Sequence, residues 1–316
     1  MRPMCWTSPR LPVFALGMVL LAASLPARAE LMSDASQFLA DYDRLVTLKG
    51  AVDADRDAMA ADLSTGKGLH QDVKHFFADR LEAAAVRLAK AADRKQMKVD
   101  LNFKGTKLEK PTPGTGVPSQ DAASYIFNYD SWLAWQKQVE LDISNMRNAV
   151  AANDAATLAV AVTSFFNDSR ARLQTRLQWQ EAIRSMKKDT GFKGTGKALP
   201  PAGTTLAEHV KEFLDDRAEW ERLGALVELD RSNLRAAVQG GQSVESIVNT
   251  FLLDRRARHV KGVELARDRK VMRKDVGLSN GSEKESKQGA QASSKDLDRD
   301  DESGALDETS DTAGEK

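Results

Sequence analysis

The stretch VELDISNMRNAV at residues 139–150 recurs as VELDRSNLRAAV at residues 227–238, with nine of the twelve positions identical. A more diverged copy, VDADRDAMAADL, occupies residues 52–63. Matches continue on both sides of each copy, and equivalent positions lie 87 to 89 residues apart. Self-similarity at a fixed period is the signature of repeat architectures, so the sequence predicts three tandem copies of one unit.

Each unit has the pattern of two helices. In the second copy Trp132, Val139 and Met146 recur every seven residues, with apolar side chains between them at spacings of three or four. This pattern is typical of an amphipathic helix. Connections inside the units are short, as in AANDA (151–155) and QGGQ (239–242), which favours antiparallel helical hairpins. We therefore expect an all-α fold: three tandem helical-hairpin repeats of about 88 residues, with six long helices.

Aromatic anchors align with this period. Phe38, Tyr125 and Phe213 are equivalent, and the segments FFADR (76–80), FFNDSR (165–170) and FLLDRR (251–256) follow at matching places. A third anchor, FKGT, marks where two of the hairpins end, at 103–106 and 192–195. Because a lone hairpin cannot bury its apolar stripe, the copies are expected to stack on one another or on a partner.

The N-terminus has the features of an export signal. Residues 1–10 are positively charged, residues 11–25 are apolar, and Ala27-Arg28-Ala29 is a small-residue cleavage site. Cleavage there leaves a chain without cysteine, because Cys5 is the only one, so disulfides and thiolate chemistry are excluded. The sequence thus predicts export to the bacterial periplasm or beyond the cell, and no transmembrane segment in the mature chain.

The predicted organisation follows from these features. It is a signal peptide (1–29), three hairpins (30–103, 121–192 and 205–278), two Pro-rich connectors (104–120 and 193–204) and an acidic tail (279–316). The tail holds 11 Asp/Glu against 5 Lys/Arg and few apolar residues, so we expect it to be disordered.

Six aspartates recur at two positions of the unit. They are Asp55, Asp142 and Asp230 at one position, and Asp79, Asp168 and Asp254 at the other. Paired carboxylates can do acid–base work, yet a catalytic site is usually needed once. Recurrence in every copy favours a structural role, such as inter-helix ion pairs or polar layers that set the register.

Lysines gather on the connectors, which are longer than usual between packed helices. They are Lys104, Lys107, Lys110, Lys193 and Lys197. If the hairpins stack in parallel, the connectors share one end, and these lysines form a basic end face suited to an anionic partner.

Two other motifs lack features that their usual functions require. The stretch GFKGTGKA (191–198) resembles a phosphate-binding loop, but Ala198 lacks the hydroxyl that holds Mg²⁺, and the stretch follows a helix rather than a strand. The histidines at 70, 75, 209 and 259 lack metal-ligand spacing, and surface or interface roles are favoured. No catalytic, cofactor-binding or metal-binding residue is predicted.

These observations favour an exported helical-repeat interaction or scaffold protein, without catalytic activity, that contacts an anionic component of the cell envelope or a protein partner. No nucleic acid is expected, and whether the chain forms a homo-oligomer stays open. One alternative is a helical bundle that binds a small ligand or cofactor. A weaker alternative is an enzyme that uses a carboxylate site between the hairpins.

Overall fold

The computed structural model describes residues 25–193 and 203–278. They form six helices: α1 (Leu25–Thr65), α2 (Leu69–Asp100), α3 (Pro118–Ala151), α4 (Ala155–Asp189), α5 (Leu206–Gln239) and α6 (Glu245–Asp275). Consecutive helices pair as α1·α2, α3·α4 and α5·α6, which confirms the all-α fold of three hairpins. None of the described helices is long and apolar enough to cross a membrane.

The helix ends have the chemistry that the sequence indicates. Asp154 caps α4 by accepting from the amides of Ala156 and Thr157, and Thr205 forms a capping box with Glu208 at the start of α5. α3 starts three residues earlier than expected, at Pro118, which occupies the first turn where its missing N–H costs nothing.

The FKGT segments lie where a helix ends, and each places an apolar side chain against the core. Gly191 follows α4 with a φ of +60°, and the next amide, of Phe192, donates to the carbonyl of Lys187. Asn102 takes the left-handed conformation after α2, and the ring centroid of Phe103 then lies 5.1 Å from that of Phe166. The stop therefore turns the chain so that an apolar side chain packs into the core at the helix end.

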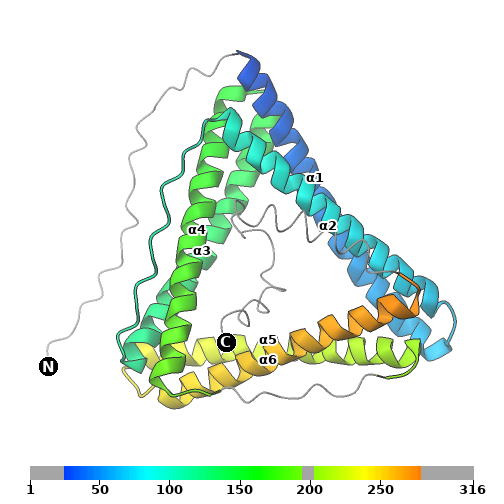
Figure 1. The fold of residues 1–316 in the computed structure, drawn as a ribbon. Helices are drawn as coiled ribbons and strands as arrows, with labels where there is room; N and C mark the ends of the chain where they lie inside the picture. The colour runs from blue at the N-terminus through cyan, green and yellow to red at the C-terminus, as the bar shows by residue number, and fades with distance from the viewer. Residues whose placement is uncertain (1–24, 194–202, 279–316) are drawn as a thin grey trace, which may run out of the picture.

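The three hairpins form the sides of a triangle (Figure 1). At each corner the open end of one hairpin, where its two chain ends lie, packs against the tip of another. The first corner joins the open end of α1·α2 to the tip of α3·α4, and the second joins the open end of α3·α4 to the tip of α5·α6. The third corner joins the open end of α5·α6 to the tip of α1·α2 and closes the ring.

Each corner is built around an aromatic pair from two different repeats. Phe38 meets Phe165 at 5.4 Å between ring centroids, Tyr125 meets Phe251 at 5.1 Å, and Phe76 meets Phe213 at 5.5 Å. The two repeated anchors of the sequence therefore pair with each other between copies rather than within one copy. The apolar stripe of each hairpin is buried in this way by its two neighbours.

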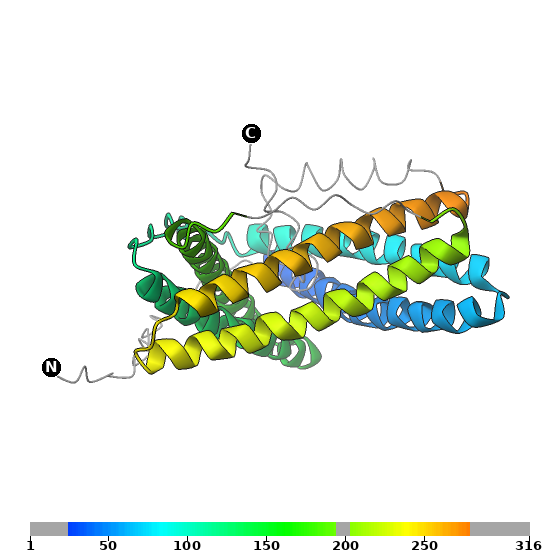
Figure 2. The same ribbon diagram turned by 90° about the horizontal axis from the view of Figure 1, so that it is seen from below.

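The triangle has two layers, as Figure 2 shows. The first helices of the hairpins, α1, α3 and α5, lie on one side and contact one another pairwise. The second helices, α2, α4 and α6, lie on the other side.

The first connector runs the length of the second hairpin, from the first corner to the second (Figure 1). Its amides at Glu109 and Thr112 donate to the side-chain oxygens of Gln174 and Gln178, at 2.8 and 2.9 Å. These glutamines lie one turn apart on α4. The unusual length of the connector is therefore required by the triangle, because the next hairpin begins at the opposite end of a long helix.

Candidate functional site

The six repeated aspartates meet in three pairs, each across one hairpin. In the second hairpin Asp142 of α3 faces Asp168 of α4, and Asp142 is 2% exposed. Burial, together with the facing Asp168 carboxyl, raises the pKa of Asp142 to about 7. The pair therefore shares a proton at mildly acidic pH, since two adjacent carboxylates in a buried place cannot both ionise cheaply.

The same arrangement recurs in the other hairpins. Burial and Asp254 raise the pKa of Asp230 to about 6, and burial and Asp79 raise the pKa of Asp55. The structural role expected of these positions from their recurrence stays a prediction. The facing group is a second carboxyl and not the cation of an ion pair.

Two further pairs of this kind lie in the first hairpin. Asp34 faces Asp100, and Asp41 faces Asp93, and burial raises the pKa of Asp34 and of Asp93 to about 6. Sequence reasoning missed them, although Asp34, Asp41 and Asp55 share a seven-residue register along α1. Residues seven apart lie on one face of a helix, so that register was the available signal.

In the third hairpin His209, at the start of α5, occupies the position equivalent to Asp34. It is buried, with Nδ1 2.5 Å from Asp275 Oδ2 and Nε2 2.6 Å from the carbonyl oxygen of Gly203. Burial favours the neutral ring, but the hydrogen bonds to Asp275 and Gly203 raise the pKa of His209. This histidine, expected at a surface or interface, instead joins the open end of the hairpin to the residues that precede it.

The carboxyl pairs are suited to holding a proton and not a metal. Each supplies two side chains, and among the described residues no group of three or more His, Cys, Asp or Glu is placed to hold a metal ion. Asp142 is also packed between its two helices. The arrangement therefore fits a structural layer whose charge depends on pH.

The structure separates the connector lysines instead of gathering them at one end. Lys104 follows Phe103, which packs in the first corner, whereas Lys193 follows Phe192, which packs in the second. Lys107 and Lys110 lie on either side of Glu109, whose amide donates to Gln174 of α4, and Lys197 lies outside the described residues. The hairpins do not stack in parallel, so the described lysines form no common end face.

Charge is instead divided between the two layers. The helices α1, α3 and α5 hold 11 Lys/Arg and 20 Asp/Glu, a net charge of −9. The helices α2, α4 and α6 hold 22 Lys/Arg and 13 Asp/Glu, a net charge of +9. The overall neutrality of the chain therefore conceals an acidic layer and a basic layer on opposite sides of the triangle (Figure 2).

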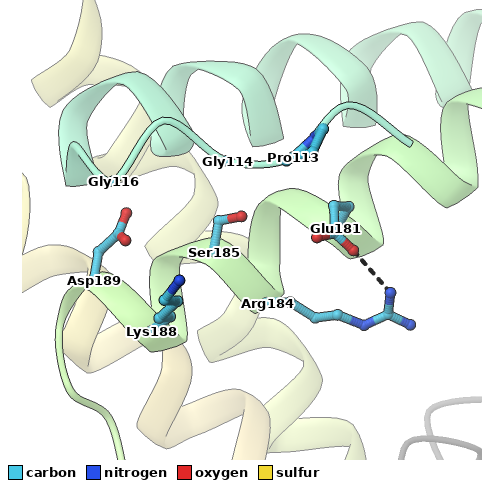
Figure 3. A pocket seen from close by; sticks show the side chains of 8 residues that line it. All are labelled: Pro113, Gly114, Gly116, Glu181, Arg184, Ser185, Lys188 and Asp189. Atoms are coloured by element: carbon cyan, nitrogen blue, oxygen red, sulfur yellow. Dashed lines mark hydrogen bonds and ion pairs between the residues drawn. The ribbon is translucent and has the colours of Figure 1, made fainter. Parts of the chain in front are cut away.

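A hollow of about 250 Å³ lies where the first connector crosses the end of α4 (Figure 3). Its lining includes Ser185, Lys188 and Asp189, and Glu181 is paired with Arg184 at 2.8 Å. Gly114 fits tightly here, because a Cβ on it would lie 2.0 Å from Ser185 Oγ. The hollow is small for a ligand site, and the charged side chains along its lining have both signs.

No family model, curated protein or solved structure matches this chain.

Proposed function

We propose that this chain is an exported helical scaffold of the bacterial periplasm whose basic layer, α2, α4 and α6, binds an anionic component of the cell envelope. The division of charge between the layers carries the proposal. A layer with a net charge of +9 attracts polyanions, and its opposite layer repels them, so binding would be one-sided.

The ring supports the scaffold function. Three corners hold long helices at fixed relative positions, and such frames present extended surfaces to partners. The carboxyl pairs between helices serve this frame as polar layers, and no catalytic step is assigned to them. A lateral face of helix arginines and lysines takes the place of the end face of connector lysines that the sequence favours.

Export is supported by where the core begins. Among the residues whose burial is described, the first of the first-corner core is Leu31, after the expected cleavage point at Ala29. Cleavage would remove only the first turn of α1. Mass spectrometry of the protein from its native host should give a chain that starts at Glu30, and an intact N-terminus would contradict export by this signal.

The binding proposal is tested with four substitutions in each layer. Exposed cations of the basic layer are changed to Gln: Lys95, Arg184, Lys270 and Lys274. The matched control changes four exposed cations of the acidic layer to Gln: Lys49, Lys137, Lys211 and Arg222. Both variants lose the same net charge, so only the position of the charge differs.

Binding is measured by cosedimentation with vesicles of phosphatidylglycerol and with a soluble anionic polysaccharide, over a series of salt concentrations. We expect the basic-layer variant to lose at least tenfold in affinity and the control to lose much less, with binding weakened by salt. Equal losses in both variants would show a net-charge effect and contradict a one-sided face. Absence of binding to either polyanion by the unaltered chain would contradict the proposal itself.

A further inference from the structure

The third corner concentrates arginines from four helices. They are Arg56 of α1, Arg80 of α2, Arg217 of α5, and Arg269 and Arg273 of α6. Arg80 lies 5.4 Å from the ring centroid of Phe76, and Arg273 lies 5.2 Å from that of Phe77. Two of the guanidinium groups therefore lie over aromatic residues of this corner, and we call all five residues the corner arginines.

The second corner shows what the equivalent arginine contacts there. Arg231, which is equivalent to Arg56, donates to the phenol oxygens of Tyr125 and Tyr129 at 2.6 and 3.0 Å. In the third corner the equivalents of these tyrosines are Phe213 and Arg217. Both phenol acceptors are lost, and a second cation replaces one of them.

Two of the corner arginines have a bonded carboxylate among the described residues. Arg56 pairs with Asp53, and Arg217 Nε donates to Glu221 at 2.6 Å. Asp268, the acid beside Arg269 in sequence, is bonded to Arg267 at 2.8 Å. Among the described residues Arg80 has no bonded carboxylate.

The effect on Arg80 is large. Burial, followed by repulsion from Arg269 and other arginines, lowers its pKa to about 9. Burial and repulsion from Arg217 and Arg56 also lower the pKa of Arg269. Half-buried cations that repel one another are costly unless an anion is added, so this corner has the electrostatics of an anion-binding site.

We propose that the corner arginines bind carboxylates of the C-terminal segment 279–316 of the same chain. This segment carries 11 Asp/Glu and 5 Lys/Arg, including the run DLDRDDE at 296–302. It continues from Leu278, which packs against the core of the third corner. Charge complementarity and the point of attachment therefore favour this segment over an unattached anion.

The attachment also makes binding intramolecular. The acidic run begins 18 residues after Leu278, a span of up to about 60 Å when extended, so it easily reaches the corner. A tether of this kind gives an effective concentration of the order of millimolar, which favours the attached carboxylates over dilute competitors. Guanidinium groups also match carboxylates in geometry, with two parallel hydrogen bonds.

Spin labels on the full chain test the proposal. One label is attached at Ser303→Cys, near the acidic run, and the other at Ala60→Cys, which is exposed on α1 beside the corner. Cys5 is replaced by Ser wherever the leader is retained. Pulsed electron paramagnetic resonance then gives the distribution of distances between the two labels.

Three variants are compared with the labelled parent chain. The corner variant carries Arg80→Gln and Arg269→Gln. The tail variant changes Asp296, Asp298, Asp300, Asp301 and Glu302 to their amides, which leaves the ring intact. The control carries Arg184→Gln and Arg222→Gln, both exposed and outside the corner. Circular dichroism and the melting temperature show that each variant is folded.

We expect the parent and the control to share a defined population of distances that the corner and tail variants lose, with at least a twofold broadening. A distribution in the corner variant that matches the parent would overturn the proposal. Inorganic pyrophosphate is added as a competing anion. If it binds the parent and the tail variant equally well, the corner is a site for free anions and the segment is not its occupant. Neither result depends on whether the basic layer binds vesicles or polysaccharide.

Discussion

The ring of Phe76, in α2, meets the ring of Phe213, in α5, edge to face at 5.5 Å between centroids. These residues lie in the first and third repeats, so their contact joins the two ends of the array. The contact is the counterpart of the Phe38–Phe165 pair of the first corner. The last repeat therefore buries its open end on the first, and the array is a closed triangle.

Removing the Phe76 ring should open the triangle at the third corner. Phe76→Ala deletes a 1%-exposed side chain, and we expect a loss of about 3–5 kcal/mol in the free energy of unfolding. The unfolding midpoint in urea gives this loss, and small-angle scattering should show a larger radius of gyration. Phe127→Ala, at a 61%-exposed position, is the control and should change little. Equal effects of the two substitutions would show that the corner contact does not hold the ring.

The carboxyl pair of the second hairpin should make stability fall as the pH rises. The pKa of Asp142 is about 7 in the folded chain and about 3.9 when unfolded. The folded state therefore holds a proton that the unfolded state has released, and its contribution, complete below the unfolded value, is lost as the pH rises through 7. Asp142→Asn should remove this slope, which is on the order of 2–3 kcal/mol between pH 5 and pH 8.

Urea midpoints at a series of pH values measure this effect. Asp215→Asn, at an exposed position on α5, is the matched control and should keep the slope of the parent chain. If the parent chain is no more stable at pH 5 than at pH 8, and Asp142→Asn behaves like it, then the two carboxyls do not share a proton.

The first connector should come loose when its glutamine contacts are removed. Gln174→Ala with Gln178→Ala removes the acceptors for the amides of Glu109 and Thr112, which lie at the surface. We expect a small change in stability, about 1 kcal/mol or less per hydrogen bond, but faster cleavage by trypsin after Lys107. Gln136→Ala, on α3, is the control. Unchanged cleavage rates would indicate that other contacts hold the connector.

Substitution by alanine at two glycines should change the free energy of unfolding in opposite directions. Gly114→Ala would place a Cβ 2.0 Å from Ser185 Oγ, and we expect a destabilisation of about 1–3 kcal/mol from overpacking. Gly50→Ala, inside α1, meets nothing within 4 Å, and we expect a stabilisation of about 0.5–1 kcal/mol because alanine favours the helix. The two midpoints in urea should therefore move in opposite directions, and a shift of both in one direction would contradict the packing at Gly114.

Much of this fold is predictable from the sequence, because the repeat and the helical period are local patterns. The pairing of helices follows from the short tips, and the caps at Asp154 and Thr205 follow from standard end chemistry. The closure of the ring, in contrast, is not predictable from local patterns. The apolar period identifies the buried face of a hairpin but not the repeat that covers it, so the partner of Phe76 is not encoded locally.

The candidate sites show the same limit. The recurrence of Asp142 and Asp168 indicates a shared structural role, but only the facing of the two helices shows that carboxyl meets carboxyl. The lysines of the connectors draw attention in the sequence because they are adjacent there. The charge of the layers is less visible, because the residues that form each layer come from three separate helices.

The closed triangle also constrains how the number of repeats can change. An open array can gain or lose a unit, because each unit contacts only its neighbours and the ends carry special capping copies. In this ring every copy is an internal copy, since each tip and each open end is covered by another repeat. Adding a repeat would change the geometry at every corner. Deleting a repeat would expose the buried surfaces of two corners. The count of three is therefore set by the corners, and we expect gene variants with two or four units to fail as folded monomers.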